Sequence, residues 1–314
     1  MKSKILAIAG PTASGKTALS IEMAKRYNGE IVSCDSMQIY KFMNIGTAKP
    51  TKEEMDGIPH YMIDEISPDE SFSVVQYVER ARGYIDDILS RGKLPVLVGG
   101  TGLYLDSVIN NTKFSDGESD EEYRNELYAL AEKEGNGAVH KLLQEIDKES
   151  AEKIHENNLR RVIRALEIYK TTGKTMTQVN LESVQEPLYD SLIIGLDVER
   201  QMLYERINRR VDIMISDGLL DEVREIMKMG INKDTTAMQA IGYKELVSYF
   251  EGHCTLDEAI EKIKQESRRY AKRQMTWLRR NEKINWIVLQ NDYNYDKIVK
   301  QSYVLADKFG IIKL

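Results

Sequence analysis

The chain has 314 residues, of which 42% are hydrophobic and 30% are charged, a length that suits one large domain with a smaller domain or an insertion. Its formal net charge of -6 by itself argues against a nucleic-acid partner, and its two cysteines, Cys34 and Cys254, are too few and too distant for a disulfide framework or a zinc cluster. The apolar start is too short to span a membrane and lacks the layout of a signal peptide, so we expect a cytoplasmic protein.

The first predicted elements surround a glycine-rich loop. Ile5–Ala9 is typical of a buried parallel strand, and Ala18–Lys25 is typical of a helix. Between them, the sequence fits the phosphate-binding pattern of glycine, four residues, and Gly-Lys-Ser/Thr. The loop consists of Gly10, Pro11, Thr12, Ala13, Ser14, Gly15, Lys16 and Thr17. Backbone N–H groups and the helix dipole would make it an anion site, with Lys16 on the terminal phosphates and the Thr17 hydroxyl on Mg²⁺.

Two further strand candidates end in polar side chains. The apolar run Glu30–Cys34 ends at Asp35, and Leu94–Val98 ends in a glycine turn that contains Thr101. Ligands bind at the carboxyl ends of strands in doubly wound sheets, so we expect Asp35 and Thr101 near the phosphate loop. Asp35 could instead cap a helix or bind Mg²⁺. No acidic residue closes the strand at Leu94–Val98, which therefore gives no support to an ATP-hydrolysing protein.

Residues 115–184 are predicted to be an all-helical insertion, which leaves 1–114 and 185–314 as an α/β core domain. Residues 115–156 contain 13 acidic and 5 basic residues and no strand candidate. A following helix carries Arg160, Arg161 and Arg164, with the first and last on one face, four residues apart. These arginines could contact a ligand, or they could form salt bridges on an ordinary helix surface. The polar residues at 174–189 are predicted to form a loop.

The last part of the chain returns to the sheet and becomes basic. A strand is expected over Ser191–Leu196, followed by a helix over Arg200–Asp217 that carries Arg210, whose guanidinium would suit a diphosphate. Another helix is expected to begin at Met238, and a last strand is expected over Trp286–Leu289. Between these elements, residues 261–280 hold eight Lys/Arg against two Glu, a local charge of +6.

This basic segment has the pattern of a nucleic-acid interface. Arg269, Arg273 and Arg280 are predicted to share one stripe of a helix, and such a stripe suits a nucleic-acid backbone. Tyr270 and Trp277 lie seven residues apart on a neighbouring stripe, where we expect them to pack into the core. The acidic net charge of the whole chain therefore conceals a basic surface.

Several specific motifs resemble those of the tRNA dimethylallyltransferase family, the bacterial prenyltransferases that modify tRNA. The stretches are GPTASGKT at 10–17, DSMQIY at 35–40, IGTAKP at 45–50, GIPHYMID at 57–64, GGTGLY at 99–104, RRVIRALE at 160–167 and QAIGYKE at 239–245. The resemblance implies a P-loop NTPase-like α/β fold with a parallel sheet flanked by helices and an all-helical insertion domain. It also implies transfer of a dimethylallyl group from dimethylallyl diphosphate to the exocyclic amine of the adenosine 3′-adjacent to the anticodon.

The resemblance assigns roles to individual residues. Asp35 would be the base, Thr101 a contact in the reaction channel, and Arg210 a contact of the diphosphate that Lys16 and Thr17 hold with Mg²⁺. The turn that would meet the flipped adenine consists of Asp35, Ser36, Met37 and Gln38. The expected contacts of the tRNA anticodon stem-loop further include Arg124, Arg160, Arg161, Val162, Ile163 and Arg164. The enzyme is expected to be a monomer.

Three other functions share parts of this pattern. A small-molecule or nucleotide kinase would have the same loop and would form ADP from ATP. A prenyltransferase acting on free adenine nucleotides would share the donor site but would not need the basic surfaces. A GTP-dependent switch usually carries an Asn-Lys-x-Asp motif, and the spacing in Asn232-Lys233-Asp234 does not match it.

Overall fold

The computed structural model describes residues 2–114, 120–289 and 294–312, and the chain divides into two compact units. The first unit comprises Met1–Ile109 and Leu188–Leu314, and the second comprises Asn110–Pro187. The insertion predicted over 115–184 lies within the range of the second unit.

The first unit is built on a parallel sheet that, in the described part of the chain, has six strands in the order β3-β2-β4-β1-β5-β6. β1 lies inside the sheet, where Ile8 is paired with Val98 of β4 and with Ile194 of β5. Strands with helices on both faces are apolar along their whole length, as the sequence of these runs is. Each strand predicted from the sequence overlaps an observed strand. The bounds are β1 (Lys4–Ala9), β2 (Gly29–Ser33), β3 (His60–Tyr61), β4 (Leu94–Gly99), β5 (Asp190–Val198) and β6 (Ile284–Leu289).

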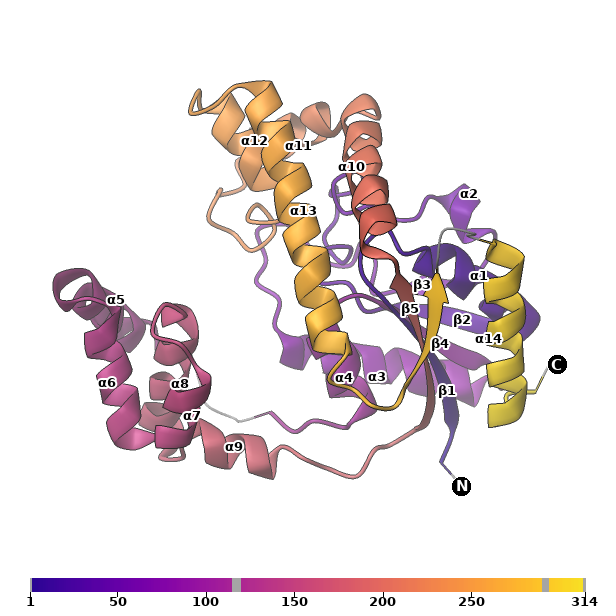
Figure 1. Ribbon diagram of the computed structural model, residues 1–314, viewed down its shortest axis with the longest axis horizontal. Helices are drawn as coiled ribbons and strands as arrows, with labels where there is room; N and C mark the ends of the chain where they lie inside the picture. The colour runs from indigo at the N-terminus through magenta and orange to yellow at the C-terminus, as the bar shows by residue number, and fades with distance from the viewer. Residues whose placement is uncertain (1, 115–119, 290–293, 313–314) are drawn as a thin grey trace. The chain divides into compact units, whose positions relative to one another are not determined.

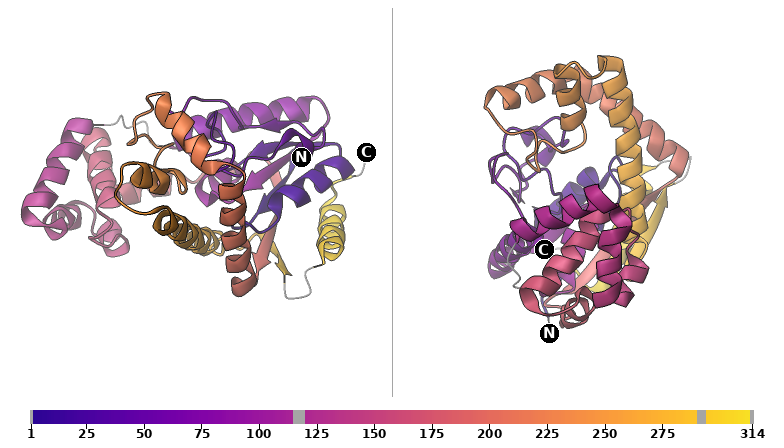
Figure 2. Two further views of the ribbon diagram at one scale, coloured as in Figure 1. Left: turned by 90° about the horizontal axis from the view of Figure 1, so that it is seen from above. Right: turned by 90° about the vertical axis from the view of Figure 1, so that its left-hand side faces the viewer.

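Helices cover both faces of this sheet. α1 and α14 pack against each other on one face, and α3 lies on the opposite face, where it contacts β2, β4 and α4 (Figures 1 and 2). α10 and α13 pack together, and α13 also contacts α12 and α4. The bounds are α1 (Lys16–Arg26), α2 (Lys52–Met55), α3 (Val74–Ser90), α4 (Gly102–Ile109), α10 (Arg200–Ser216), α11 (Leu219–Lys228), α12 (Tyr243–Phe250), α13 (Leu256–Leu278) and α14 (Tyr295–Phe309).

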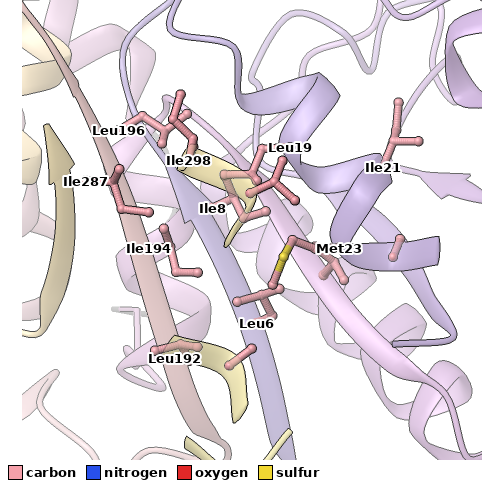
Figure 3. Packing of buried hydrophobic residues seen from close by; sticks show 14 of the residues in the cluster. Leu6, Ile8, Leu19, Ile21, Met23, Leu192, Ile194, Leu196, Ile287 and Ile298 are labelled. Atoms are coloured by element: carbon pink, nitrogen blue, oxygen red, sulfur yellow. The ribbon is translucent and has the colours of Figure 1, made fainter. Parts of the chain in front are cut away.

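The core of the first unit follows from the alternation of side chains along its strands. Leu6 and Ile8 of β1 are fully buried, and both belong to a cluster with Leu19 and Met23 of α1 (Figure 3). Ile298 of α14 joins the same cluster. Successive side chains of a strand point to opposite faces, so the intervening residues of β1 face the other layer of helices. The phosphate loop therefore follows a strand that is fixed on both faces.

The second unit is all-helical and has a core of its own. Its buried side chains include Leu127, Val139, Leu143, Val162 and Leu166, which come from α5, α6 and α8. Gly173 ends α8 with a φ of +70°, a conformation that suits glycine. The helices are α5 (Glu121–Glu134), α6 (Asn136–Ile146), α7 (Lys148–Lys153), α8 (Leu159–Thr172) and α9 (Met176–Glu182).

Three predicted elements differ from the structure, and one helix was not predicted. α9 occupies part of the predicted loop at 174–189, because Thr175 and Gln178 form a capping box that starts a helix. α12 begins at Tyr243 and not at Met238, since Gly242 has a φ of +98° that a helix cannot include. α13 ends at Leu278, so Arg280 lies beyond the helix. The helix α14 is absent from the prediction. No helix in the described ranges is long and apolar enough to cross a membrane.

Candidate active site

The phosphate loop connects β1 directly to α1, which begins at Lys16. Ala13 and Gly15 have φ values of +61° and +92°, which turn the chain back between the strand and the helix. The loop is tight, because a Cβ added to Gly10 would lie 2.8 Å from the Ser14 Oγ. It also lies at the N-terminus of α1, where the helix dipole favours an anion. Pro11 and Ser14 are buried and form the body of the loop.

A cavity of about 430 Å³ opens at the carboxyl ends of the strands in the first unit. Residues from the phosphate loop, the turn after β2 and helices α10 and α13 line it. The residues predicted from the sequence that line this cavity are Thr12, Lys16, Thr17, Asp35, Ser36, Met37, Gln38 and Arg210. The structure therefore brings the predicted donor-binding and adenine-binding groups into one space.

Two cations in this cavity have no carboxylate bonded to them within the described residues. The Lys16 Nζ donates a hydrogen bond to the Pro11 carbonyl at 2.6 Å, and an Nη of Arg210 lies 3.4 Å from the Thr12 Oγ1. Burial, and next the charge of Arg210, lower the pKa of Lys16 to about 7. Burial likewise lowers the pKa of Arg210. Two half-buried cations without a bonded carboxylate can bind an anion, since a negative charge beside them would favour the protonated form of both side chains.

Asp35 provides the negative charge of the cavity. Its Oδ1 accepts the backbone N–H of Met37 at 2.8 Å and that of Gln38 at 3.4 Å, which holds the turn after β2. This is the capping behaviour that the sequence left open, in a turn and not in a helix. The Asp35 charge raises the pKa of both Lys16 and Arg210, so the carboxylate lies close to the anion site. The other carboxylate oxygen has no hydrogen-bond donor among the described residues.

Thr101 is not among the residues that line the cavity. Its backbone N–H donates to the Cys34 carbonyl at 3.3 Å, and its hydroxyl is buried beside that of Tyr270 without a well-formed hydrogen bond to any described residue. Tyr270 does line the cavity. The contact predicted for Thr101 in the reaction channel therefore stays a prediction, and the structure shows only that its side chain adjoins Tyr270.

Sequence reasoning missed the contribution of α13 to the phosphate loop. Gln274 is buried, and its Oε1 accepts the backbone N–H of Thr12 at 2.9 Å. Gln274 follows Tyr270 by four residues, so both side chains share the face of α13 that meets the cavity. The sequence signal for this contact was weak: Tyr270 and Gln274 form an uncharged stripe on a helix that is otherwise basic. Arg273, predicted as part of the basic stripe, also lines the cavity.

The basic segment is only partly available to a ligand. Lys264 pairs with Asp212 at 2.8 Å, and Arg269 pairs with Glu266 at 2.7 Å. Arg279 pairs with Asp197 at 3.0 Å. Lys272, Arg273 and Arg280 have no ion pair within the described residues, and together with Arg269, Thr276 and Trp277 they line a surface hollow, called here the basic hollow. Trp277 is held against α4, where its Nε1 donates to Asp106 at 2.5 Å.

The residues of the helical unit that were predicted to contact tRNA differ in burial and in ion pairing. Arg124 and Arg164 both bind the buried carboxylate of Glu167, at 2.7 Å and 2.5 Å. This is the salt-bridged alternative that the sequence left open. Val162 and Ile163 are 0% and 2% exposed and belong to the core of the unit, so direct contact of their side chains with tRNA is contradicted by their burial.

Arg160 and Arg161 have the opposite environment. Both are exposed at the start of α8, and neither has an ion pair in the described part of the chain. They are the two cations of the predicted tRNA-contact stretch that remain free for a ligand.

Known proteins are similar to this chain in sequence and in fold. The model of the IPP transferase family matches residues 38–281. A tRNA dimethylallyltransferase of Acetivibrio thermocellus is 52% identical over 308 residues, which are 98% of each chain. A tRNA dimethylallyltransferase of Bacillus cereus strain AH187 is 53% identical over 299 residues, which are 95% of this chain and 94% of that one.

Solved structures give the same result. The tRNA isopentenylpyrophosphate transferase of Bacillus halodurans is 48% identical and superimposes with a TM-score of 0.75 over 98% of this chain and 97% of its own. A eukaryotic dimethylallyltransferase acting on tRNA is 29% identical, with a TM-score of 0.81 over 98% of this chain and 79% of its own. The chain belongs to the IPP transferase family, together with the tRNA dimethylallyltransferases that it matches over nearly its whole length.

Proposed function

We propose that the chain transfers the dimethylallyl group of dimethylallyl diphosphate to the exocyclic amine of the adenosine 3′-adjacent to the anticodon of tRNA. The observation that carries this proposal is one cavity that combines two unpaired cations, Lys16 and Arg210, with the carboxylate of Asp35. Family membership supports the reaction class, and the cavity supports the division of labour within it.

The donor end of the cavity would hold the diphosphate. An allylic diphosphate leaves readily when its developing charge is neutralised, which is what preorganised cations in a cavity from which water is excluded provide. Lys16 and Arg210 would bind its oxygens, and the N-terminus of α1 would add its dipole. The Thr12 hydroxyl already lies beside Arg210 and would help to orient the inner phosphate. These cations would therefore contribute to catalysis by neutralising the leaving group.

The residues present also fit a Mg²⁺ ion. Mg²⁺ bound with phosphates usually keeps several waters and takes one or two protein ligands. The Thr17 hydroxyl lines the cavity at the start of α1 and would be its protein ligand, whereas the described residues contain no group of three or more His, Cys, Asp or Glu that could hold a metal alone. Bound there with the diphosphate, Mg²⁺ would supply further positive charge to the leaving group.

The acceptor end would hold the adenine. The amine nitrogen would form a bond to the first carbon of the dimethylallyl group while the carbon–oxygen bond to diphosphate breaks. The nitrogen then carries an extra proton, which the Asp35 carboxylate would accept. The base must leave its stack to enter the cavity, at a cost of a few kcal/mol that is lowest in a loop that is already single-stranded. Ser36, Met37 and Gln38 line the cavity next to Asp35 and would contact it.

Two groups of cations would bind the anticodon stem-loop. One is the basic hollow on α13, and the other consists of Arg160 and Arg161 on α8. Each has cations without ion pairs in the described ranges, which is the condition for phosphate contacts that release counterions. We further propose that the protein acts as a monomer in the cytoplasm.

The proposal is tested by incubating the protein with labelled dimethylallyl diphosphate and unmodified tRNA, then mapping the label by nucleoside mass spectrometry. The expected product carries the prenyl group on the adenosine 3′ of the anticodon. A parallel assay with ATP as donor would give ADP if the protein were a kinase. A third assay with AMP as acceptor would give a prenylated nucleotide if tRNA were not required, and either result would contradict the proposal.

A further inference from the structure

Glu222 of α11 binds a loop that is distant from it in sequence. Its carboxylate accepts the backbone N–H groups of Asn44 and Ile45, both at 2.8 Å, and that of Gly46 at 3.1 Å. The Tyr243 hydroxyl donates a fourth hydrogen bond to it at 2.6 Å. Four donors on one carboxylate indicate that this side chain fixes the conformation of the loop, since each backbone N–H would otherwise need another partner.

The same loop holds the side chain of Gln38. The Gln38 Nε2 donates to the Ala48 carbonyl at 3.2 Å and lies 3.4 Å from that of Thr47. On the other side, the Gln38 Oε1 accepts the Ser33 hydroxyl at 3.1 Å. The two ends of the carboxamide therefore have different partners, which determine its orientation. Gln38 lines the cavity beside Asp35, so the loop controls which face of this amide is presented there.

The Tyr243 ring packs closely against the loop of residues 44–48. A Cβ added to Gly46 would lie 2.5 Å from the Tyr243 ring, so glycine is required for this close approach. The ring is fully buried, at the start of α12. Gly46, Thr47 and Ala48 line the cavity, whereas Glu222 and Tyr243 do not. The loop is therefore the part of the cavity wall to which the Glu222 carboxylate is hydrogen-bonded directly.

We propose that Glu222 and Tyr243 are positioning residues for the acceptor adenine: they hold residues 44–48, and through this loop they orient the carboxamide of Gln38. The inference rests on the proposed function, because it assigns the role of the acceptor end of the same cavity. The donor end does not share these contacts, since Lys16 and Arg210 bind the phosphate loop. The two ends can therefore be separated experimentally.

The first test is Glu222→Gln, which keeps the shape of the side chain but replaces one acceptor oxygen by an N–H₂ donor that faces donors. We expect kcat/KM for unmodified tRNA to fall by roughly 10²-fold, the effect of a small misplacement of a reacting group. Pyrophosphate affinity, measured by calorimetry, should stay within about twofold of wild type, a margin well inside tenfold steps of affinity. Tyr243→Phe removes one hydrogen bond and keeps the ring, so its loss should be about tenfold or less. Glu225→Gln is the matched control, because Glu225 lies on the same helix and its side chain pairs, among the described residues, only with Lys228.

The second test asks whether Glu222 acts through Gln38. If it does, the double variant Glu222→Gln/Gln38→Ala should be about as slow as Gln38→Ala alone, because coupled sites are not additive. Multiplicative losses in the double variant would overturn the proposal. So would an equal loss of pyrophosphate affinity in Glu222→Gln, which would show a general loss of structure. Both experiments need tRNA turnover by the wild type.

A third measurement does not depend on the proposed function. Hydrogen exchange of the peptide covering residues 44–48 should be at least about tenfold faster in Glu222→Gln than in Glu225→Gln, since local opening sets the exchange rate. Unchanged exchange would refute the anchoring role even if the enzyme prenylates tRNA. If exchange is faster in Glu222→Gln but the wild type prenylates no tRNA, the anchoring role of Glu222 is supported and the proposed function is refuted.

Discussion

Two pairs of positively charged side chains, one in each unit, have opposite environments. In the α/β unit, Lys16 and Arg210 point into a cavity and have no ion pair within the described residues. In the helical unit, Arg124 and Arg164 share the buried carboxylate of Glu167. All four residues were predicted to contact a ligand, but only the first pair lacks a carboxylate partner in the described part of the chain.

The difference teaches how to separate binding cations from structural ones. An unpaired buried cation costs free energy of folding, and a protein keeps it where a ligand later supplies the counter-charge. A cation paired with a buried carboxylate has already found its counter-charge, and removing either partner leaves the other exposed to the desolvation cost. The two classes should therefore respond differently to mutation, one in activity and the other in stability.

The largest expected effect is at Asp35, the carboxylate beside the unpaired cations. Asp35→Ala and Asp35→Asn should each lower the single-turnover rate by roughly 10²–10⁴-fold, the usual range for general acid–base catalysis. Asparagine can still accept the N–H groups of Met37 and Gln38, so the turn after β2 should persist in that variant. Rapid-quench measurement of the chemical step distinguishes the roles.

Two outcomes would change the assignment. Near-wild-type chemistry in Asp35→Asn would mean that the carboxylate only holds the turn. Recovery of most of the rate at high Mg²⁺ would mean that it is a metal ligand. In either case phosphate clamping by Lys16 and Arg210 would carry the catalysis.

The second effect concerns Lys16, whose pKa is about 7 in the free protein. Bound diphosphate favours the protonated ammonium, so the pKa rises on binding and a proton is taken up above pH 7. Pyrophosphate affinity should therefore be constant with respect to this group below pH 7, and fall by up to about tenfold per pH unit above it. Lys16→Ala should lower turnover by roughly 10²–10³-fold, leave tRNA binding intact and remove this pH dependence.

Calorimetry in two buffers of different ionisation enthalpy measures the proton uptake directly. The comparison of wild type with Lys16→Ala removes the contribution of pyrophosphate itself. Equal proton uptake in both proteins would show that Lys16 is not the titrating group. A parallel loss of tRNA affinity would show that the loop is shared or structural.

The third effect belongs to the paired class. Glu167→Gln should lower the free energy of unfolding by about 2 kcal/mol, less than the roughly 3–5 kcal/mol expected for a fully buried pair, because both arginines are more than one-third exposed. Urea denaturation of the variant measures the change. Single-turnover chemistry on saturating tRNA should remain close to wild type. If Glu167→Gln instead has normal stability and slow chemistry, this ion-pair network acts in catalysis and not in stability.

The smallest effect distinguishes free from paired lysines on one helix. Lys272 has no ion pair among the described residues, whereas Lys264 binds Asp212 and Glu261. Lys272→Ala should flatten the log–log salt dependence of tRNA binding by about 0.7, the value for one phosphate contact on a single strand. Lys264→Ala should leave the slope nearly unchanged. Filter binding at several salt concentrations tests this, and equal slopes for the two variants would remove the basic hollow from the tRNA interface.

The fold could be predicted well, because the signals for strands, helices and the phosphate loop depend on residues that are close in sequence. The strand before Gly10 and the helix after Thr17 follow from hydrophobic periodicity, and both are present. The site was harder, because pairing depends on residues that the fold brings together. Nothing in the local sequence shows that Glu167 neutralises Arg124, or that Gln274 meets the backbone of Thr12 from a helix more than 250 positions later. Charge alone therefore overestimated the number of cations that have no ion pair.

The position of β1 in the sheet has a consequence for how the protein is made. β1 is synthesised before the other described strands, but one of its two neighbours is β5, which begins only at Asp190. Until then, the strand that carries the phosphate loop has an unpaired apolar edge, and such edges pair readily with other chains. The earliest of the described strands is thus among the last to obtain both of its neighbours in the sheet. A ribosome that stalls after the helical unit would release a chain with the whole phosphate motif and an open sheet edge, which we expect to aggregate before it can bind any phosphate.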